Sequence, residues 1–215
     1  MSFPSKDTMK QASLAMLRNA STVASRGRKP SLPLSLLIEA AWTSVGVTSP
    51  VYESILRSRI RILQQLQKEL EEMTSLLVQE CRTRAPQAMT LLNSIDGLGD
   101  VTTAHFLAET AAREFANAKK LIAFAGLDPV IRESGHWKGR GRISKRGNRS
   151  LRRVLFLMSV AVIRHNPVFH ELYDRKRREG KVYRQAVLIV AHKLLRVIHA
   201  MLRHQIPFNP CPQSL

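Results

Sequence analysis

The sequence predicts a mainly α fold in which a long coiled-coil-like helix precedes a helical domain. Apolar residues recur at intervals of three and four over residues 52–82, which is the period of a helix surface. Shorter stretches with this period follow, and most of them end at Gly or Pro. Strand signals are sparse, so we expect at most a small hairpin around residues 130–144. The other single helices are expected at residues 34–45, 117–125, 151–164, 168–179 and 182–202.

Size and composition favour a folded protein without a membrane segment. The chain has 215 residues, 44% of them hydrophobic, which is enough to bury the core of one or two compact domains. No apolar run is expected to approach the length of a membrane span, the longest being around residues 154–163. Cys81 and Cys211 lie far apart without metal-ligand spacing, which indicates free thiols in a reducing compartment. We therefore expect a cytoplasmic protein that makes no membrane contact.

Three regions are expected along the chain. Residues 1–50 form an N-terminal remnant or linker with one short helix. The first 29 residues are basic and rich in serine and loosely resemble an organelle transit peptide, but a frayed N-terminus is the preferred interpretation. Residues 51–84 form the coiled-coil helix, and residues 85–215 form a C-terminal domain.

The long helix carries an apolar seam of the kind found in coiled coils. Apolar side chains occupy a and d positions at alternating spacings of three and four, with Arg59 at one d-like position, while Gln, Lys and Glu keep the outer face polar. The seam predicts dimerisation through this helix. The alternative is an ordinary amphipathic helix in a monomer. The seam consists of Leu56, Leu63, Leu66, Leu70, Met73 and Leu77.

Residues 91–110 are typical of a helix-hairpin-helix element. Two helical patterns are joined by the sequence DGLG, residues 96–99. Glycines at this spacing allow positive φ angles and bring backbone N–H groups close to an anion at the start of the second helix. Gly97 and Gly99 are therefore candidate contacts to a nucleic-acid backbone. A purely structural tight turn is the alternative.

Positive charge is concentrated in the C-terminal half. Residues 132–215 contain 19 Lys and Arg against four Asp and Glu, whereas residues 1–131 contain 15 against 12. A field of one sign attracts a polyanion through phosphate neutralisation and counterion release, so nucleic acid is the expected partner. A basic membrane-surface helix is the alternative, but it needs basic residues along one helix face, and these cluster in Gly-rich loop sequence.

The densest basic segment, residues 131–153, reads IRESGHWKGRGRISKRGNRSLRR and holds nine Lys or Arg against one acid. Glycines alternate with basic residues from Gly135 to Gly147, which suits a loop around a phosphate backbone. Ser144 is predicted to cap the helix that follows, and Trp137 either stacks on a base or anchors the loop. The candidate nucleic-acid-binding residues here are Lys138, Arg140, Arg142, Lys145, Arg146, Arg149, Arg152 and Arg153.

Histidines and acids show no metal-ligand pattern. His192 and His199 lie on one helix face without a third ligand, which indicates core or surface roles. Four acids superficially resemble a carboxylate cluster, but they fall around a turn and along a helix and are interpreted as solvated. This chain by itself is therefore expected to bind no metal or other cofactor. The four acids are Asp96, Asp100, Glu109 and Glu114.

Four motifs, in order, resemble the C-terminal domain of the insertion-sequence one-ten and one-sixteen family of transposases. They read LLNSIDGLGDVTTAHFLAE, AFAGLDPVIRESGHWKGRGRISKRGNRSLRRVL, NPVFHELYDRKRREGK and AHKLLRVIHAMLRHQIPF. With the preceding coiled coil, the resemblance covers residues 54–209. It implies that residues 85–215 are a transposase domain, with its serine motif at residues 126–153.

The resemblance implies a DNA transposase or site-specific recombinase that uses a serine nucleophile. In the family, a serine-glycine pair after GLxP attacks a DNA phosphodiester and forms a covalent phosphoserine intermediate; here the pair is Ser134-Gly135, after GLDP at residues 126–129. Such a link conserves the phosphoester energy for rejoining. The basic residues from 138 to 146 are then expected to clamp the phosphate. Ser144 is the second candidate.

The resemblance also implies partners, namely DNA, a structured guide RNA and further copies in an oligomer, in the nucleoid of a bacterial cytoplasm. Family members begin with a ribonuclease-H-like, RuvC-like domain whose carboxylates bind divalent metal. No βαβ pattern precedes residue 34, so we expect a truncated or split relative, with Mg²⁺ bound only where that domain is supplied.

Two classes of function follow. In the first, the chain is a recombinase or the serine-bearing half of one. In the second, it is a non-catalytic DNA- or RNA-binding remnant that dimerises with full-length transposase. A covalent DNA adduct that depends on Ser134 distinguishes them.

Overall fold

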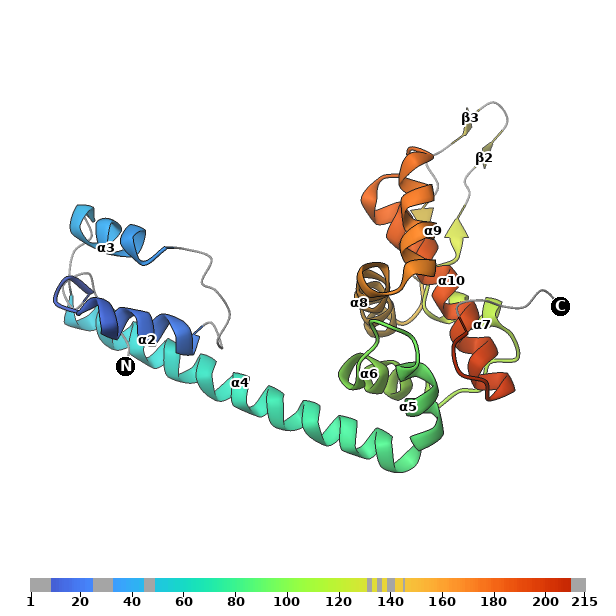
Figure 1. The fold of residues 1–215 in the computed structure, drawn as a ribbon, viewed down its shortest axis with the longest axis horizontal. Coiled ribbons are helices and arrows are strands. Elements are labelled where there is room, and N and C mark those ends of the chain that lie inside the picture. Colours follow the sequence, from blue (N-terminus) through green and yellow to red (C-terminus); the bar gives the residue numbers. More distant parts are fainter. Residues whose placement is uncertain are drawn as a thin grey trace. The chain divides into compact units, whose positions relative to one another are not determined.

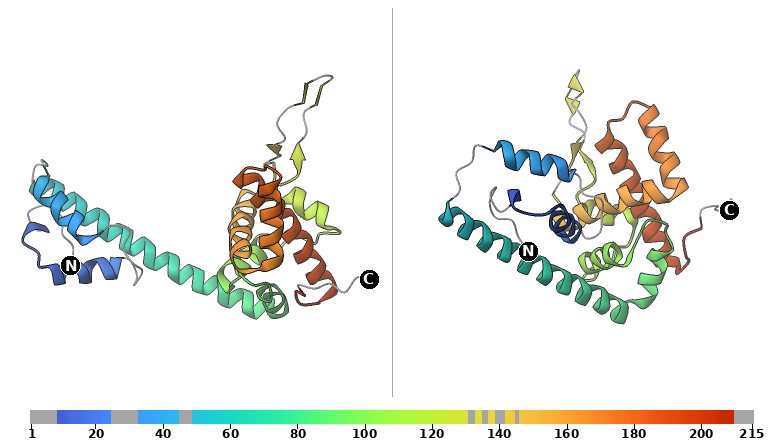
Figure 2. Two further views of the ribbon diagram at one scale, coloured as in Figure 1. Left: turned by 45° about the horizontal axis from the view of Figure 1, so that its top comes forward. Right: turned by 60° about the vertical axis from the view of Figure 1, so that its left-hand side comes forward.

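The computed structural model describes residues 9–24, 33–44, 49–130, 133–134, 137–138, 142–144 and 146–209. The chain divides into two compact units, Met1–Glu72 and Met73–Leu215, and the boundary falls within one helix, α4 (Pro50–Arg84). Helices make up most of each unit, as Figures 1 and 2 show. The prediction of a mainly α fold is confirmed.

Two short helices pair in the first unit. The predicted helix after residue 33 is α3 (Leu34–Thr43), and it contacts α2 (Leu14–Ala24), which the sequence analysis did not predict. Leu17 alone among the described residues of α2 is buried, at 5% exposure.

The predicted long helix is present as α4. Five of the six seam residues have exposed fractions between 40% and 67%. The exception is Leu77. Leu77 instead packs, with Val78, against the buried side chains of Cys81, Met89 and Ala104. The last turns of α4 therefore belong to the core of the second unit. The coiled coil itself stays a prediction. The exposed seam residues are Leu56, Leu63, Leu66, Leu70 and Met73.

The second unit contains six further helices, each at or near a predicted position. They are α5 (Pro86–Asn93), α6 (Asp100–Thr110), α7 (Ala118–Phe124), α8 (Arg149–His165), α9 (Pro167–Arg178) and α10 (Tyr183–His204). Asparagine caps begin three of them: the side chains of Asn117, Asn148 and Asn166 accept hydrogen bonds from backbone N–H groups of α7, α8 and α9. Pro86 and Pro167 stand in the first turns of α5 and α9, where a missing N–H costs nothing.

The core of the second unit lies around α8 and α10, which contact each other and most other helices. Both helices bury an apolar stripe, and the fully buried Phe106 and Phe169 add α6 and α9 to the same cluster. The residues of α8 and α10 in this apolar cluster are Leu151, Val154, Leu155, Met158, Val162, Ile163, Val187, Val190, Ala191, Leu194, Leu195, Ile198 and Met201.

The expectation that no segment reaches the length of a membrane span is wrong for α10. Among the described residues, α10 is one helix long and apolar enough for a span by length and composition. Its apolar stripe, however, packs in the core, and 44% of the apolar window is buried. A core helix passes the same test, and burial gives α10 that role.

The small hairpin predicted around residues 130–144 is present as two antiparallel pairs. β1 (Pro129–Val130) pairs with β4 (Arg142–Ile143), and β2 (Glu133–Ser134) pairs with β3 (Trp137–Lys138). The pairs follow one another along the segment between α7 and α8.

Candidate nucleic-acid interface

The chain leaves α7 through a Schellman turn. Gly126 has a φ of +65°, and the N–H groups of Gly126 and Leu127 donate to the carbonyls of Ala123 (2.8 Å) and Ile122 (3.1 Å). Leu127 and Ile122 are 1% and 5% exposed, so the apolar contact that accompanies this motif is buried. The first two residues of GLDP therefore end the helix and enter the core.

Gly147 lies directly against this turn. The N–H of Asn148 donates to the carbonyl of Phe124 at 2.7 Å. A Cβ at residue 147 would lie 2.1 Å from the Phe124 carbonyl oxygen and 2.3 Å from the Gly126 nitrogen, closer than real contacts allow. The two glycines thus bring the end of α7 against the start of α8, so the basic segment between them begins and ends at one place.

Asp128 and Ser144 hold the base of the hairpin. The Ser144 N–H donates to the Asp128 carbonyl at 2.9 Å, and the Ser144 hydroxyl donates to Asp128 Oδ1 at 2.6 Å. The first strand pair continues from there, with Pro129 opposite Ile143. The last two residues of GLDP therefore position the hairpin.

The prediction that Ser144 caps the next helix is wrong, because Asp128 takes its hydroxyl. The cap is Asn148, whose Oδ1 accepts from the Leu151 N–H at 3.0 Å. Its Nδ2 donates to Glu109 Oε2 of α6 at 2.7 Å. Asn148 therefore caps α8 and also joins it to α6.

Two histidines of α10 bond to backbone carbonyls on either side of α7. His192 Nε2 lies 2.7 Å from the Leu127 carbonyl, and His199 Nε2 lies 3.0 Å from the Phe115 carbonyl. Both rings are half-buried. The prediction of core or surface roles for these histidines is confirmed.

The predicted nucleophile lies in the second strand pair. Ser134 pairs with Trp137 and Glu133 pairs with Lys138, so Ser134 is the last paired residue before the chain reverses. The side chains of Ser134, Trp137, Lys138 and Arg142 lie outside the described part of the structure, as do Arg140 and Lys145 altogether. The roles assigned to these residues stay predictions.

The described arginines of the segment divide into exposed and bonded side chains. Arg146, Arg149 and Arg153 are exposed. Arg152 is half-buried, and its Nη1 donates to the Ala125 carbonyl at 2.9 Å. Arg152 therefore anchors α8 to the end of α7, whereas Arg146, Arg149 and Arg153 present their charge to solvent.

The first turn of α8 combines two sources of positive potential. Its free N–H groups carry the positive end of the helix dipole, and the turn contains no acidic residue. Cations are unfavourable at this end of a helix, yet Arg149 stands in the first turn and Arg153 follows one turn later. An anion offsets that repulsion, so the arrangement suits a phosphate group.

The connection between α5 and α6 gives its two glycines different environments. Gly97 has a φ of +95°, and a Cβ there would lie 2.7 Å from the Ala161 carbonyl oxygen of α8. Gly99 is exposed, has open space around a Cβ, and donates its N–H to the Thr102 hydroxyl at 3.3 Å. Packing therefore explains Gly97, while Gly99 remains open to a ligand. Binding by a helix-hairpin-helix stays a prediction.

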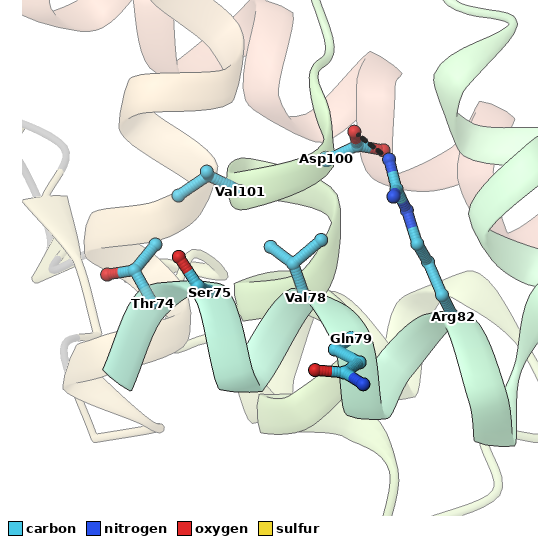
Figure 3. A pocket seen from close by; sticks show the side chains of 7 residues that line it. All are labelled: Thr74, Ser75, Val78, Gln79, Arg82, Asp100 and Val101. Carbon is cyan, nitrogen blue, oxygen red and sulfur yellow. Dashed lines mark hydrogen bonds and ion pairs between the residues drawn. The ribbon is translucent and has the colours of Figure 1, made fainter. Parts of the chain in front are cut away.

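Two of the four acids interpreted as solvated have partners. Asp100 accepts from Arg82 Nη2 at 2.5 Å and from Asn93 Nδ2 at 2.7 Å, and Glu109 is bonded to Asn148. The Asp100 side chain is still 38% exposed, so it stays in contact with solvent, and Glu109 is half-buried; neighbouring helices bring donors to both. The Arg82–Asp100 pair also lines a pocket together with Thr74, Ser75, Val78, Gln79 and Val101 (Figure 3).

The residues that the structure describes contain no cluster of side chains that could bind a metal ion. No three His, Cys, Asp or Glu side chains gather there as ligands for an ion.

Comparison with known proteins finds a transposase family that is similar to the part of the chain around the site. Residues 89–174 match the Transposase IS116/IS110/IS902 family. This range runs from α5 to α9 and includes the hairpin and the start of α8.

Several known proteins are similar to part of the chain. The insertion element IS900 uncharacterized 42 kDa protein of Mycobacterium paratuberculosis is 38% identical over 139 residues, which are 64% of this chain and 35% of that protein. The insertion element IS116 uncharacterized 44.8 kDa protein of Streptomyces clavuligerus is 38% identical over 125 residues, 57% of this chain and 31% of the relative. The pilin gene-inverting protein of Moraxella bovis is 30% identical over 132 residues, which are 60% of this chain and 41% of that protein. The aligned region thus spans less than half of each relative.

Proposed function

We propose that this chain, whose residues 89–174 match the Transposase IS116/IS110/IS902 family, acts in DNA transposition or site-specific recombination. The observation that carries the proposal is the basic segment between α7 and α8, whose two ends are held together at Gly126 and Gly147. A relative named for inverting a pilin gene supports a reaction that cuts and rejoins DNA.

Ser134 is the nucleophile in the proposed reaction. Its hydroxyl oxygen attacks a backbone phosphorus, a phosphoserine ester forms, and the bond from phosphorus to the leaving strand's oxygen breaks. That oxygen takes up a proton, and the reverse reaction with another strand end rejoins the DNA without an external energy source. The place of Ser134 beside the chain reversal, on a hairpin tied at its base by Asp128 and Ser144, supports this assignment.

The basic side chains hold the phosphates around that serine. Arg146, Arg149 and Arg153 are exposed at the start of α8, where the helix dipole adds to their charge. We assign Lys138, Arg140, Arg142 and Lys145 to the phosphate under attack, because fixed positive charge stabilises the charge that develops on phosphoryl oxygens.

The proposal includes three kinds of partner. DNA is the substrate, a structured RNA is the guide, and a second copy pairs through the exposed seam of α4. A divalent metal ion is expected only where a RuvC-like domain supplies the carboxylates. The exposed seam equally favours the second candidate function, a non-catalytic DNA- or RNA-binding protein that pairs with full-length transposase.

A suicide substrate tests the serine chemistry. The full chain is incubated with nicked element-end DNA, with guide RNA and the RuvC-like domain added in trans, and protein-DNA adducts are separated under denaturing conditions. We expect an adduct with the wild type and none with Ser134→Ala. Ser58→Ala is the matched control, because Ser58 is exposed on α4, outside the basic segment, and its loss should leave the adduct unchanged.

Two results would contradict the proposal. An adduct that persists in Ser134→Ala would move the nucleophile elsewhere. Absence of any adduct from wild type, together with intact DNA binding, would leave only the non-catalytic function.

A further inference from the structure

A second concentration of positive charge lies at the turn between α9 and α10, outside the basic segment already described. Residues 175–184 contain six Lys or Arg and one acid, Glu179. We call this group the basic corner; it consists of Arg175, Lys176, Arg177, Arg178, Lys181 and Arg184. Figures 1 and 2 show α9 and α10 side by side, joined by this turn, and the two helices are in contact.

The backbone of the basic corner is held in one conformation. Gly180 has a φ of +80°, and the N–H groups of Gly180 and Lys181 donate to the carbonyls of Arg177 and Lys176, each at 3.1 Å. This pattern is a Schellman turn. Beside it, the rings of Tyr173 and Tyr183 meet edge to face with centroids 6.3 Å apart and join α9 to α10. The charges are therefore presented from a fixed frame, which lowers the ordering cost of binding.

Only two of the six cations of the basic corner, Lys176 and Arg177, form hydrogen bonds to other groups within it. Lys176 Nζ binds both carboxylate oxygens of Glu179, at 2.8 and 2.9 Å, and this bond lowers the pKa of Glu179. Arg177 Nη1 donates to the Lys181 carbonyl at 2.8 Å. The remaining four side chains are exposed and form no salt bridge in the part of the chain that the structure describes, although the charges of Arg175 and Lys181 also lower the pKa of Glu179. These four side chains are Arg175, Arg178, Lys181 and Arg184.

Helix capping does not account for this excess. Cations in the last turn of a helix interact favourably with the negative end of its dipole, and Arg175 to Arg178 benefit in that way. Lys181 and Arg184, however, lie beyond α9, and Arg184 stands in the first turn of α10, where the dipole opposes a cation. Like charges so close together also repel each other, so folding alone gives no reason for the cluster.

The basic corner lies close to the hairpin. His192 of α10 binds the Leu127 carbonyl, one residue before Asp128 at the hairpin base. Tyr183, at the start of α10, precedes His192 by nine residues, or roughly 13 Å along the helix axis. The major groove of B-DNA is about 12 Å wide. A duplex held at the hairpin therefore has further phosphates within reach of the corner.

We infer that the basic corner binds the phosphate backbone of duplex DNA beside the segment that carries Ser134, an inference that rests on the proposed function. Four exposed cations without a salt bridge, on a rigid turn, match a row of phosphates, and contacts of this kind position a duplex without reading its sequence. Arg178 and Lys181, on either side of the Schellman glycine, are its central contacts.

Salt-dependent binding tests the inference. The full-length double variant Arg178→Gln, Lys181→Gln is compared with wild type by fluorescence anisotropy on duplex DNA, from about 50 to about 200 mM salt. We expect the slope of log K against log salt to become shallower by about 1.8, which corresponds to two lost phosphate contacts. Lys119→Gln, Lys120→Gln is the control, because it removes the same charge from exposed positions in the first turn of α7.

The outcomes separate this inference from the proposed function. Equal changes of slope in the two double variants would overturn the inference, because net charge would then explain both. A larger loss on duplex RNA than on duplex DNA would overturn the choice of DNA. The covalent adduct at Ser134 tests the proposed function independently of the basic corner. If the wild type forms the adduct and the corner variant binds DNA as tightly as the wild type, only the inference about the basic corner is rejected. A corner effect without any adduct would reject the serine chemistry alone.

Discussion

Replacing Gly97 by alanine tests whether this glycine serves packing or ligand binding. Two structural features oppose a side chain there: the φ of +95°, and the Ala161 carbonyl oxygen 2.7 Å from an ideal Cβ. That oxygen belongs to the backbone of α8, which is a core helix and cannot move aside cheaply. Gly97→Ala therefore combines backbone strain with overpacking.

The magnitude follows from these two terms. A left-handed backbone costs a non-glycine residue about 1–2 kcal/mol, and the lower entropy of the unfolded alanine chain returns about 0.4–1 kcal/mol. Overpacking a rigid site adds about 1–3 kcal/mol. We expect Gly97→Ala to lower the free energy of unfolding by about 2–4 kcal/mol, a large share of the total for a domain.

Two other glycines supply matched controls. Gly180 has a φ of +80° with open space around a Cβ, so Gly180→Ala should cost only the backbone strain, about 1 kcal/mol. Gly99 lacks a positive φ, has open space, and occupies the N-cap of α6, where serine is a preferred residue. Gly99→Ser should leave stability within about 0.5 kcal/mol of wild type. Urea unfolding followed by circular dichroism measures all three.

A stability of Gly97→Ala equal to that of Gly180→Ala would refute the packing argument, since the two share the strain and differ only in the contact. DNA binding adds a second readout. If the folded Gly99→Ser variant loses affinity for DNA at unchanged stability, the open glycine lies at a ligand, as the helix-hairpin-helix hypothesis predicts.

Two further predictions concern side chains with buried partners. Arg152→Gln should lower the free energy of unfolding by about 1–3 kcal/mol, because the Ala125 carbonyl loses a charged donor. Arg153→Gln, on the exposed face of the same helix, should change the free energy of unfolding by less than about 0.5 kcal/mol. Equal effects of the two substitutions in urea unfolding would contradict the role assigned to Arg152. Burial raises the pKa of the Cys81 thiol, with a smaller contribution from the Glu80 carboxylate, so the thiol stays protonated at neutral pH. The stability linked to the protonated thiol is fully present below the pKa of the thiol in the unfolded chain and is lost as pH rises from there through the raised pKa. In a Cys211→Ser background, iodoacetamide should label Cys81 slowly in the native protein and rapidly in urea, and equal rates would show that the site is open.

Local pattern was enough to predict most helices of the second unit. Long stretches such as α4 and α10 repeat the helical period many times, and Gly126, Gly180 and Pro167 mark helix ends through backbone geometry that belongs to the residue itself. The helix α2 was not predicted, because residues 1–50 were expected to be a remnant or linker with one short helix, and that helix is α3.

Residue type and order also identified the basic segment, since charge and glycine content are properties of composition. Which of its residues face solvent depended on the tertiary structure. Arg152 and Arg153 are adjacent and identical in chemistry, yet only Arg152 reaches the end of α7. The sequence cannot separate them, because the Ala125 carbonyl comes from a helix 27 residues earlier.

Sequence by itself therefore determined the helices and the sign of the surface charge, because both arise from neighbours along the chain. Tertiary structure decided which group each hydroxyl or glycine contacts within the fold. Ser144 binds Asp128 instead of capping α8, and Gly97 lies against Ala161 instead of only shaping a turn. A hydroxyl or a glycine satisfies many local patterns equally well, and only the packing of distant segments selects the contact that each one makes.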